Sequence, residues 1–503
     1  MKTSFEKLNQ LVREKNSRVI LGLDPTAEEF ELAKKGIEGY FKVLIDQAEP
    51  YIVGIKPNLA FYEGNTQMRN AMANIMAYAK GKGLVTIMDA KRGDIMDTMA
   101  EYAKADLKNF NPDIVTLHSY SGQDSVQPFL DQNPQVCAYI MGAMSNPTAK
   151  VQNLDVDGLK VAAHVALDAA NWGKGRVGLV VGATQGKALE HIRMAEKEYG
   201  YKPMPVLAPG LGKQGGKPFA DINSVFPISS GLTKEKYLNG RTIAEAAKDW
   251  RDEINAQVKQ TKVSPSLCDY AINSLIDGGF VKLAKSSDLI ADGFFLKKGK
   301  DKLSKAGLSL PSDKDAKISS LREFVNNGVL SPDDFSALFI NLRDIMGMTD
   351  IQARNVIGHL YTKQVVDSGV KPEVVGGVPY GAIWPAMQVA QNLGVPCIIE
   401  RKEADLVHDK IVGGNHSGKR GIIVEDILTT GGSSIEFAGS LRANGIEVND
   451  VYAFLDRQQG AKENFAKATP KLKLHAVADM DYLKYLINKN PNIDNGVKDL
   501  ICR

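Results

Sequence analysis

The sequence predicts two α/β domains in series: a (β/α)8 TIM barrel, then an open, doubly wound domain with a mostly parallel sheet. Three observations support this prediction. The first 235 residues repeat a short β-branched run followed by a longer amphipathic stretch. Five further strand-like runs alternate with helical patterns in the second half. A polar stretch with Ser-Pro and no periodicity, residues 260–269, separates the two patterns.

Eight strands are expected in the first half, separated by helical patterns such as residues 66–83, whose apolar residues recur at spacings of three and four. The predicted strands are residues 19–24, 51–58, 84–91, 114–120, 137–144, 176–184, 204–212 and 222–232. Eight parallel strands with helical crossovers close into a barrel, whose chemistry lies at the carboxyl ends of the strands. Polar residues at those ends are therefore candidate site residues.

The last barrel helix is expected at about residues 240–258. We therefore predict a first domain at 1–258, a linker at 259–268 and a second domain at 269–503. The strands of the second sheet are predicted at residues 373–378, 396–401, 421–426, 450–456 and 474–480. Ligands of such sheets gather at strand ends and glycine-rich turns.

The composition argues against several classes of protein. The formal net charge of +3, from 62 basic and 59 acidic residues, provides no overall field for binding nucleic acid. The four cysteines are scattered, as in a reducing compartment. No apolar run approaches the ~20 residues of a membrane span, and we identify neither a signal segment nor a peroxisomal SKL ending. We expect a cytoplasmic protein with small-molecule partners and no membrane.

The first group of candidate residues is the run DAKRGD at 89–94, which ends the third strand. Side-chain alternation places Asp89 and Lys91 on one face of the strand. Lys56 closes the second strand and Asp24 closes the first, so these charges can meet at the barrel mouth. A solvated charge cluster is the alternative, but burying such a network is costly unless it has a role.

This pattern resembles the orotidylate decarboxylase family, together with GIKPNLAFYE at 54–63, MSNPTA at 144–149 and PGLGKQGG at 209–216. The resemblance spans nearly the whole first half. It implies decarboxylation without a metal or organic cofactor, with Lys91 protonating pyrimidine C6 and preorganised charge stabilising the transition state. The catalytic residues implied are Lys56, Asp89, Lys91 and Asp94. The nucleotide-binding residues implied are Asp24, Thr98, Ser145, Gln214 and Gly215.

In that family the last Asp of the motif and a nearby Thr reach a neighbouring subunit, which implies a dimer through Asp94 and Thr98. The family's phosphate-clamping arginine is absent, because the sequence has Ser230 at that position. Backbone amides, Gln214, Lys213 or Lys217 are left to bind the phosphate. An alternative for this half is a related barrel that acts on sugar phosphates with magnesium; Lys56 and Ser145 argue against it.

The second group of candidate residues is GIIVEDILTTGGSS at 421–434, a buried strand, two acids and a glycine turn entering a helix. The turn amides and the helix dipole can bind a 5′-phosphate. This stretch resembles the phosphoribosyl pyrophosphate motif of type I phosphoribosyltransferases. The resemblance implies that Glu425 and Asp426 accept hydrogen bonds from ribose hydroxyls, and that the turn Thr429, Thr430, Gly431 and Gly432 binds phosphate.

Other segments, including GVPYGAIWPA at 377–386 and DRQQG at 456–460, resemble the orotate branch of that family. They imply orotate contacts by Arg457 and a substrate contact by Lys297. The segment 399–410 resembles the loop that closes over pyrophosphate, with Arg401 and Lys402 matching and Asp405 in place of a lysine. Magnesium is implied, held chiefly by the substrate's own oxygens, with no protein metal cage.

Together the two resemblances imply successive steps of pyrimidine synthesis on one chain, with a transferase and a lyase activity. The second half would form orotidine 5′-phosphate and pyrophosphate from orotate and phosphoribosyl pyrophosphate, and the first half would convert orotidine 5′-phosphate to uridine 5′-monophosphate. A homodimer or homotetramer is expected. The alternative for the second half is a regulatory module that binds phosphoribosyl pyrophosphate without catalysis.

Overall fold

The computed structural model describes residues 2–25, 36–212, 215–262, 264–283, 302–311, 314–330, 338–340, 342, 345–400, 411–495 and 497–498. The chain divides into two compact units, which are described separately below. The first unit contains residues 1–156 and 160–266, and the second contains 157–159 and 267–503. Among the described residues, no helix has both the length and the apolar character needed to cross a membrane.

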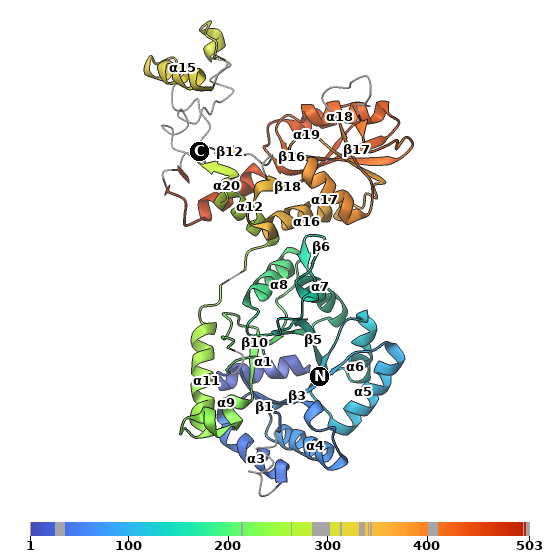
Figure 1. Ribbon diagram of the computed structural model, residues 1–503, viewed down its shortest axis with the longest axis vertical. Helices are drawn as coiled ribbons and strands as arrows, with labels where there is room; N and C mark the ends of the chain where they lie inside the picture. Colours follow the sequence, from blue (N-terminus) through green and yellow to red (C-terminus); the bar gives the residue numbers. More distant parts are fainter. Residues whose placement is uncertain are drawn as a thin grey trace. The chain divides into compact units, whose positions relative to one another are not determined.

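The first unit is a closed barrel of eight parallel strands, which confirms the predicted fold (Figure 1). Its strands, in sequence order, are β1 (Val19–Leu23), β2 (Gly54–Pro57), β3 (Val85–Arg92), β4 (Ile114–Leu117), β5 (Cys137–Ala143), β8 (Val177–Val181), β9 (Val206–Leu207) and β10 (Ser224–Ile228). The order around the barrel is β1-β10-β9-β8-β5-β4-β3-β2. Strand β9 is shorter than the predicted 204–212 because Pro209 and the glycines after it form a turn instead.

Helices surround the strands, as expected from the helical patterns between the β-branched runs. They are α3 (Gly36–Ala48), α4 (Thr66–Gly81), α5 (Met96–Phe110), α6 (Gln127–Gln132), α7 (Val161–Gly173), α8 (Gly186–Glu198), α9 (Ser230–Thr233), α10 (Glu235–Leu238) and α11 (Ile243–Val258). The short strands β6 (Asp155–Val156) and β7 (Leu159–Lys160) precede α7. Helix α11 begins with a capping box in which Thr242 and Glu245 satisfy each other's backbone amides.

Helix α1 (Ser4–Lys15) closes the amino end of the barrel. The side chain of Ser4 donates to the carbonyl of Gln135, just before β5, and Lys7 donates to the carbonyl of Leu84, just before β3. The apolar face of α1 joins the barrel core, where the ring of Phe5 meets that of Tyr139 edge-on at 5.0 Å between centroids. With this end filled, the open end is the one where the strands finish.

The second unit is built on an open six-stranded sheet with the order β15-β14-β13-β16-β17-β18. Its strands are β13 (Val374–Gly377), β14 (Cys397–Glu400), β15 (Ile411–Val412), β16 (Arg420–Leu428), β17 (Glu447–Asp456) and β18 (Lys473–Asp479). Neighbouring strands run parallel except β14 and β15. The prediction of a mostly parallel, doubly wound sheet is confirmed, and β15 is an additional edge strand too short for a periodicity signal.

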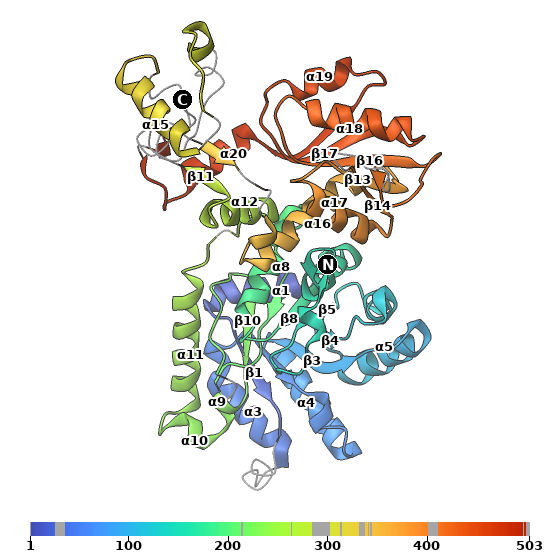
Figure 2. The same cartoon turned by 45° about the horizontal axis from the view of Figure 1, so that its top comes forward.

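Helices cover both faces of this sheet, with α16 and α17 on one side and α18 and α19 on the other (Figure 1, Figure 2). The helices of the unit are α12 (Leu267–Asp277), α15 (Lys314–Asn326), α16 (Ile351–Asp367), α17 (Ile383–Leu393), α18 (Gly432–Ala443), α19 (Ala461–Lys467) and α20 (Met480–Lys489). A separate antiparallel pair, β11 (Val281–Leu283) and β12 (Leu338–Ile340), precedes the main sheet in the chain.

Candidate active sites

Lys56, Asp89 and Lys91 meet at the carboxyl ends of β2 and β3, as the sequence pattern predicts. The Nζ of Lys56 lies 2.6 Å from one carboxylate oxygen of Asp89, and the Nζ of Lys91 lies 2.5 Å from the other. Lys56 and Asp89 are buried, whereas the side chain of Lys91 is 39% exposed. Two cations therefore share one anion, and one of the two cations remains open to a ligand.

The charges of this group depend on one another. Burial disfavours ionisation of Asp89, but the ammonium groups of Lys56 and Lys91 outweigh it and hold the pKa of that carboxyl well below its usual value. Burial also opposes the charge of Lys56, but Asp89 and Asp24 outweigh it and raise its pKa. Asp89 and Lys56 are therefore both charged at neutral pH.

The backbone at the end of β3 departs from regular strand geometry. Lys91 has a φ of +49°, in the left-handed region that non-glycine residues rarely adopt. The pairing of β3 with β4 shifts register between Met88 and Arg92. Arg92 then anchors this strand end to α5 through Asp106, at 3.1 Å. The sequence pattern did not indicate this irregularity, which sets the direction of the Lys91 side chain.

A cavity of about 210 Å³ opens beside these charges. Its lining includes Lys56, Asp89, Lys91, Thr116, Met141, Met144, Ser145, Asn146 and Pro209. Ser145, predicted to contact the ligand, follows β5 and lies in this lining. Sequence reasoning missed Thr116 and Asn146. The signal for Thr116 was a hydroxyl inside an otherwise apolar strand, at a position where β4 faces the end of β3.

Asp24 is held at the end of β1 by Ser229, which lies after β10 and donates to the Oδ2 of Asp24 at 3.0 Å. The other carboxylate oxygen, Oδ1, is buried and has no hydrogen-bond partner among the described residues. A buried acceptor without a donor costs roughly 1–3 kcal/mol. A ligand hydroxyl placed there would supply the missing donor.

Asp94 and Thr98 do not line this cavity. Asp94 is half-buried and accepts a hydrogen bond from the backbone amide of Ile95 at 2.8 Å, while Thr98 is exposed in the first turn of α5. Within a single chain these two predicted residues are thus separated from the charges they were expected to join.

The turn after β9 is built on glycines. Gly215 has a φ of +71°, and a Cβ on Gly216 would come within 2.6 Å of the side chain of Ala183. The predicted ligand residue Gln214 lies outside the described residues, as does Lys213. Beside Ser230, Arg241 shares a cavity of about 370 Å³ with Gly212, but its guanidinium is bound to Asp249 at 2.7 Å.

In the second unit, Glu425 and Asp426 lie near the end of β16. Glu425 is buried and accepts a hydrogen bond from Ser434 at 3.0 Å. Burial, and then the neighbouring Asp426, raise the pKa of Glu425 to about 8. A Cβ on Gly381 would come within 1.9 Å of a carboxylate oxygen of Asp426, so only glycine allows that close approach. The two acids differ, since one is enclosed and the other is half-buried.

The turn that follows the acids is open at the surface. Thr430 and Gly432 are exposed and Thr429 is half-buried, at the start of α18. Gly431 has a φ of +76°, and a Cβ there would meet the ring of Phe465 at 2.4 Å. The predicted phosphate-binding turn is thus accessible, and a glycine is required at its centre.

Arg457 lies next to this turn, because its backbone amide donates to the carbonyl of Leu428 at 2.8 Å. Its Nε is buried without a hydrogen-bond partner among the described residues, and burial lowers the pKa of the guanidinium. The predicted residues Lys297, Arg401 and Lys402 lie outside the described residues, as does Asp405. Within the described part of the chain, no cluster of three or more His, Cys, Asp or Glu side chains has the arrangement of a metal site.

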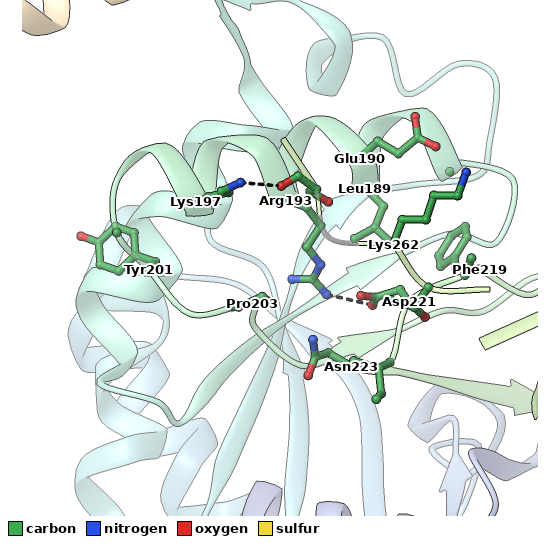
Figure 3. A pocket seen from close by; sticks show the side chains of 16 residues that line it. Leu189, Glu190, Arg193, Lys197, Tyr201, Pro203, Phe219, Asp221, Asn223 and Lys262 are labelled. Atoms are coloured by element: carbon green, nitrogen blue, oxygen red, sulfur yellow. Dashed lines mark hydrogen bonds and ion pairs between the residues drawn. The ribbon is translucent and has the colours of Figure 1, made fainter. Parts of the chain in front are cut away.

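A further cavity, of about 550 Å³, lies on the outside of the barrel between α8 and the segment after α11 (Figure 3). Its charged centre is Arg193, which binds Glu196 at 2.8 Å and Asp221 at 2.9 Å. Lys197 at its edge donates to the carbonyl of Ser264 at 3.0 Å. Arg193, Glu196, Asp221 and Lys197 thus already have partners within the protein.

Comparisons with known proteins identify relatives of the barrel and of the chain as a whole. Residues 17–253 match the family described as "Orotidine 5'-phosphate decarboxylase / HUMPS family". An orotidine 5'-phosphate decarboxylase of Halobacterium salinarum is 35% identical over 224 residues, which cover 42% of this chain and 79% of that protein. The bifunctional enzyme PyrF/PyrE of Nostoc sp. is 26% identical over 485 residues, 91% of each chain. The structure of Leishmania donovani UMP synthase has 27% identity and a TM-score of 0.48, covering 100% of this chain and 99% of that chain.

Proposed function

The chain belongs, through its barrel, to the orotidine 5'-phosphate decarboxylase / HUMPS family, and we propose from this premise that it makes uridine 5′-monophosphate from orotate in two steps. The second unit joins orotate to phosphoribosyl pyrophosphate, and the barrel decarboxylates the product. The similarity to a bifunctional relative along 91% of the chain supports both activities on one polypeptide. It also disfavours a purely regulatory second unit.

In the barrel, the C6–carboxylate bond breaks, carbon dioxide leaves, and the electron pair remains on pyrimidine C6. The ammonium of Lys91 gives a proton to that carbon, and solvent then returns a proton to the lysine. Asp89 stays ionised because its pKa is low, so it holds Lys91 in place and repels the substrate carboxylate. Charge already arranged before the reaction needs no reorganisation during it, which is the main source of such rate enhancement.

The remaining barrel residues bind the nucleotide. The partnerless oxygen of Asp24 accepts a ribose hydroxyl, with Lys56 between this hydroxyl and Asp89. Ser145 faces the pyrimidine amide edge from the cavity wall. Gln214 and the amide of Gly215 hold the 5′-phosphate in the turn after β9.

Asp94 and Thr98 act on the cavity of a second copy of the chain. Two exposed apolar side chains beside them in the chain support this: Ile95 (63% exposed) and Met96 (42%). Apolar surface gathered beside the open end of a barrel is typical of an interface. We therefore propose a homodimer or a homotetramer built from such dimers, and its test is sedimentation of the full chain.

In the second unit, Glu425 and Asp426 accept the ribose hydroxyls of phosphoribosyl pyrophosphate. The turn Thr429, Thr430, Gly431 and Gly432 binds the 5′-phosphate through its amides, at the start of the 12-residue helix α18. Arg457 pairs with the orotate carboxylate, which would bring an anionic acceptor close to its buried Nε. Lys297, Arg401 and Lys402 contact the substrates and the leaving pyrophosphate.

Magnesium fits this second site by the chemistry of the donors, since carboxylate and phosphate oxygens are the ligands that it prefers. It would neutralise the leaving pyrophosphate and be held chiefly by substrate oxygens, while Glu425 and Asp426 orient the ribose. The barrel chemistry uses no cofactor. A reducing, cytoplasmic setting is supported by the three free cysteines of the described residues, Cys137, Cys268 and Cys397.

The observation that carries the proposal is Asp89 between Lys56 and Lys91 in the wall of a cavity. The test supplies orotate, phosphoribosyl pyrophosphate and magnesium, and follows uridine 5′-monophosphate. With Lys91→Ala, we expect orotidine 5′-phosphate to accumulate. With a chelator, orotate consumption should stop, whereas added orotidine 5′-phosphate is still decarboxylated. A barrel that also stops with the chelator would instead point to metal-dependent sugar-phosphate chemistry.

A further inference from the structure

Thr116, on β4, makes two hydrogen bonds inside the barrel site that give its hydroxyl a defined direction. The backbone amide of Lys91 donates to its Oγ1 at 3.0 Å, and this Oγ1 lies 2.9 Å from the Oδ1 of Asp89. Since a carboxylate only accepts, the hydroxyl proton must point to Asp89. Thr116 is 1% exposed and lines the cavity, so water does not compete for these bonds.

These bonds form a closed ring with Lys91 at both ends. The backbone amide of Lys91 binds Thr116, Thr116 binds the Oδ1 of Asp89, and the same oxygen receives the ammonium of Lys91 at 2.5 Å. The backbone and the tip of one lysine are thus tied to a common point. Lys56 holds the other carboxylate oxygen of Asp89 at 2.6 Å. Because both oxygens are bound, the carboxylate cannot rotate without losing its hydrogen bond to Thr116.

The ring also secures an unfavourable backbone conformation. A left-handed φ such as the +49° of Lys91 is unfavourable for a non-glycine residue and persists only where the surroundings impose it. Regular pairing with β4 is interrupted at this point. The hydroxyl of Thr116 therefore replaces a strand partner for the amide of Lys91.

We propose that Thr116 is a positioning residue for decarboxylation, which fixes the ammonium of Lys91 at the reacting carbon by holding both its backbone and its counterion. This inference rests on the proposed decarboxylase function. Without the hydroxyl, Asp89 still contacts both lysines, but the Lys91 amide loses its partner and the lysine tip gains freedom. Misplacement by about 1 Å can slow a reaction about 100-fold. Substrate affinity should change little, because the proposed phosphate and ribose contacts are made by other residues.

The test compares kcat and KM for orotidine 5′-phosphate in the full-length protein. For Thr116→Val, which is nearly isosteric, we expect kcat to fall about 10- to 100-fold with KM within about threefold of wild type. Thr116→Ser keeps the hydroxyl and should return kcat to within about threefold of wild type. If Thr116→Val does not fold, as judged by circular dichroism, Thr116→Ala removes the same hydroxyl with less bulk and takes its place.

Thr86 provides a matched control. It is buried on β3, its hydroxyl lies 3.0 Å from a carboxylate oxygen of Asp113, and it accepts from the backbone amide of Asp113 at 3.1 Å. The same pair of bonds is thus present away from the cavity, so Thr86→Val should lower the melting temperature without lowering kcat. A kcat for Thr116→Val within threefold of wild type, or equal losses in Thr116→Val and Thr116→Ser, would overturn the inference. A wild-type chain that does not decarboxylate orotidine 5′-phosphate would overturn the proposed function, and this inference with it.

Discussion

Asp89→Asn should destabilise the barrel strongly, because Asp89 is the shared counterion of a buried lysine. Lys56 and Asp89 contact at 2.6 Å with side chains only 7% and 8% exposed. Removing one partner of a buried pair costs about 3–5 kcal/mol, since the other charge stays buried without compensation. For a unit of this size that corresponds to a fall of about 6–20 °C in melting temperature. Differential scanning calorimetry of the full chain measures it.

The pH dependence of this effect has a defined sign. The pKa of Asp89 is lowered, so its stabilising contribution is present at neutral pH and is lost as the pH falls through that low value. The pKa of Lys56 is raised, so its contribution is lost only as the pH rises through the raised value. In Asp89→Asn, burial acts on Lys56 with only Asp24 opposing it, which lowers the pKa. The variant should therefore become more stable as the pH rises from about 7 to 9, unlike the wild type.

The double variant Lys56→Met with Asp89→Asn is the control. Removing both charges of a buried pair is often nearly neutral, so the double variant should recover at least half of the lost melting temperature. The short contact indicates that Lys56 and Asp89 compensate each other's buried charge. This would be refuted if Asp89→Asn melts within about 2 °C of wild type, or if the double variant is less stable than Asp89→Asn.

Three further predictions concern the second unit and the barrel together. Because the pKa of Glu425 is raised to about 8, its contribution to the free energy of unfolding is greatest at acid pH and is lost as the pH rises towards that value. Glu425→Gln should make the melting temperature, measured by calorimetry, depend less on pH. A pH dependence equal to that of the wild type would contradict this prediction. Gly381→Ala would put a Cβ within 1.9 Å of Asp426 and should raise the KM for phosphoribosyl pyrophosphate about tenfold. The control is Gly439→Ala, where a Cβ meets nothing within 4 Å and the KM should not change. Equal effects of the two substitutions on KM would refute the steric argument. Lys91→Ala should leave the consumption of orotate unchanged while uridine 5′-monophosphate formation stops, and a simultaneous loss of both rates would show that the lysine acts beyond the barrel.

The sequence predicted best what short-range patterns determine. The barrel strands stand out because runs such as 177–181 are buried on both faces and therefore uniformly apolar. Asp89 and Lys91 lie two residues apart on one strand, so the alternation of side chains along a strand was enough to predict that they share a face. The acids at the end of β16 and the glycine turn around Gly431 are adjacent in the chain, so the sequence alone places them together.

Long-range closure and backbone irregularity were not predictable in this way. Ser229 holds Asp24 from 205 residues away, a contact that exists only because β10 returns to β1. The left-handed Lys91 and its bond to Thr116 depend on an interrupted register between two strands, which no periodicity records. Asp94 ends the motif in sequence but does not line the cavity of its own chain, because β3 ends at Arg92, before it.

Helix α1 has a consequence for how the nucleotide enters and leaves the barrel. Phe5 and Leu8 join the core at the amino end, so the described residues of the barrel leave the carboxyl ends of the strands, where the cavity lies, as the side on which the nucleotide enters and leaves. The product nucleotide then has to dissociate before the next substrate nucleotide can bind. Uridine 5′-monophosphate should accordingly act as a competitive inhibitor of the decarboxylation.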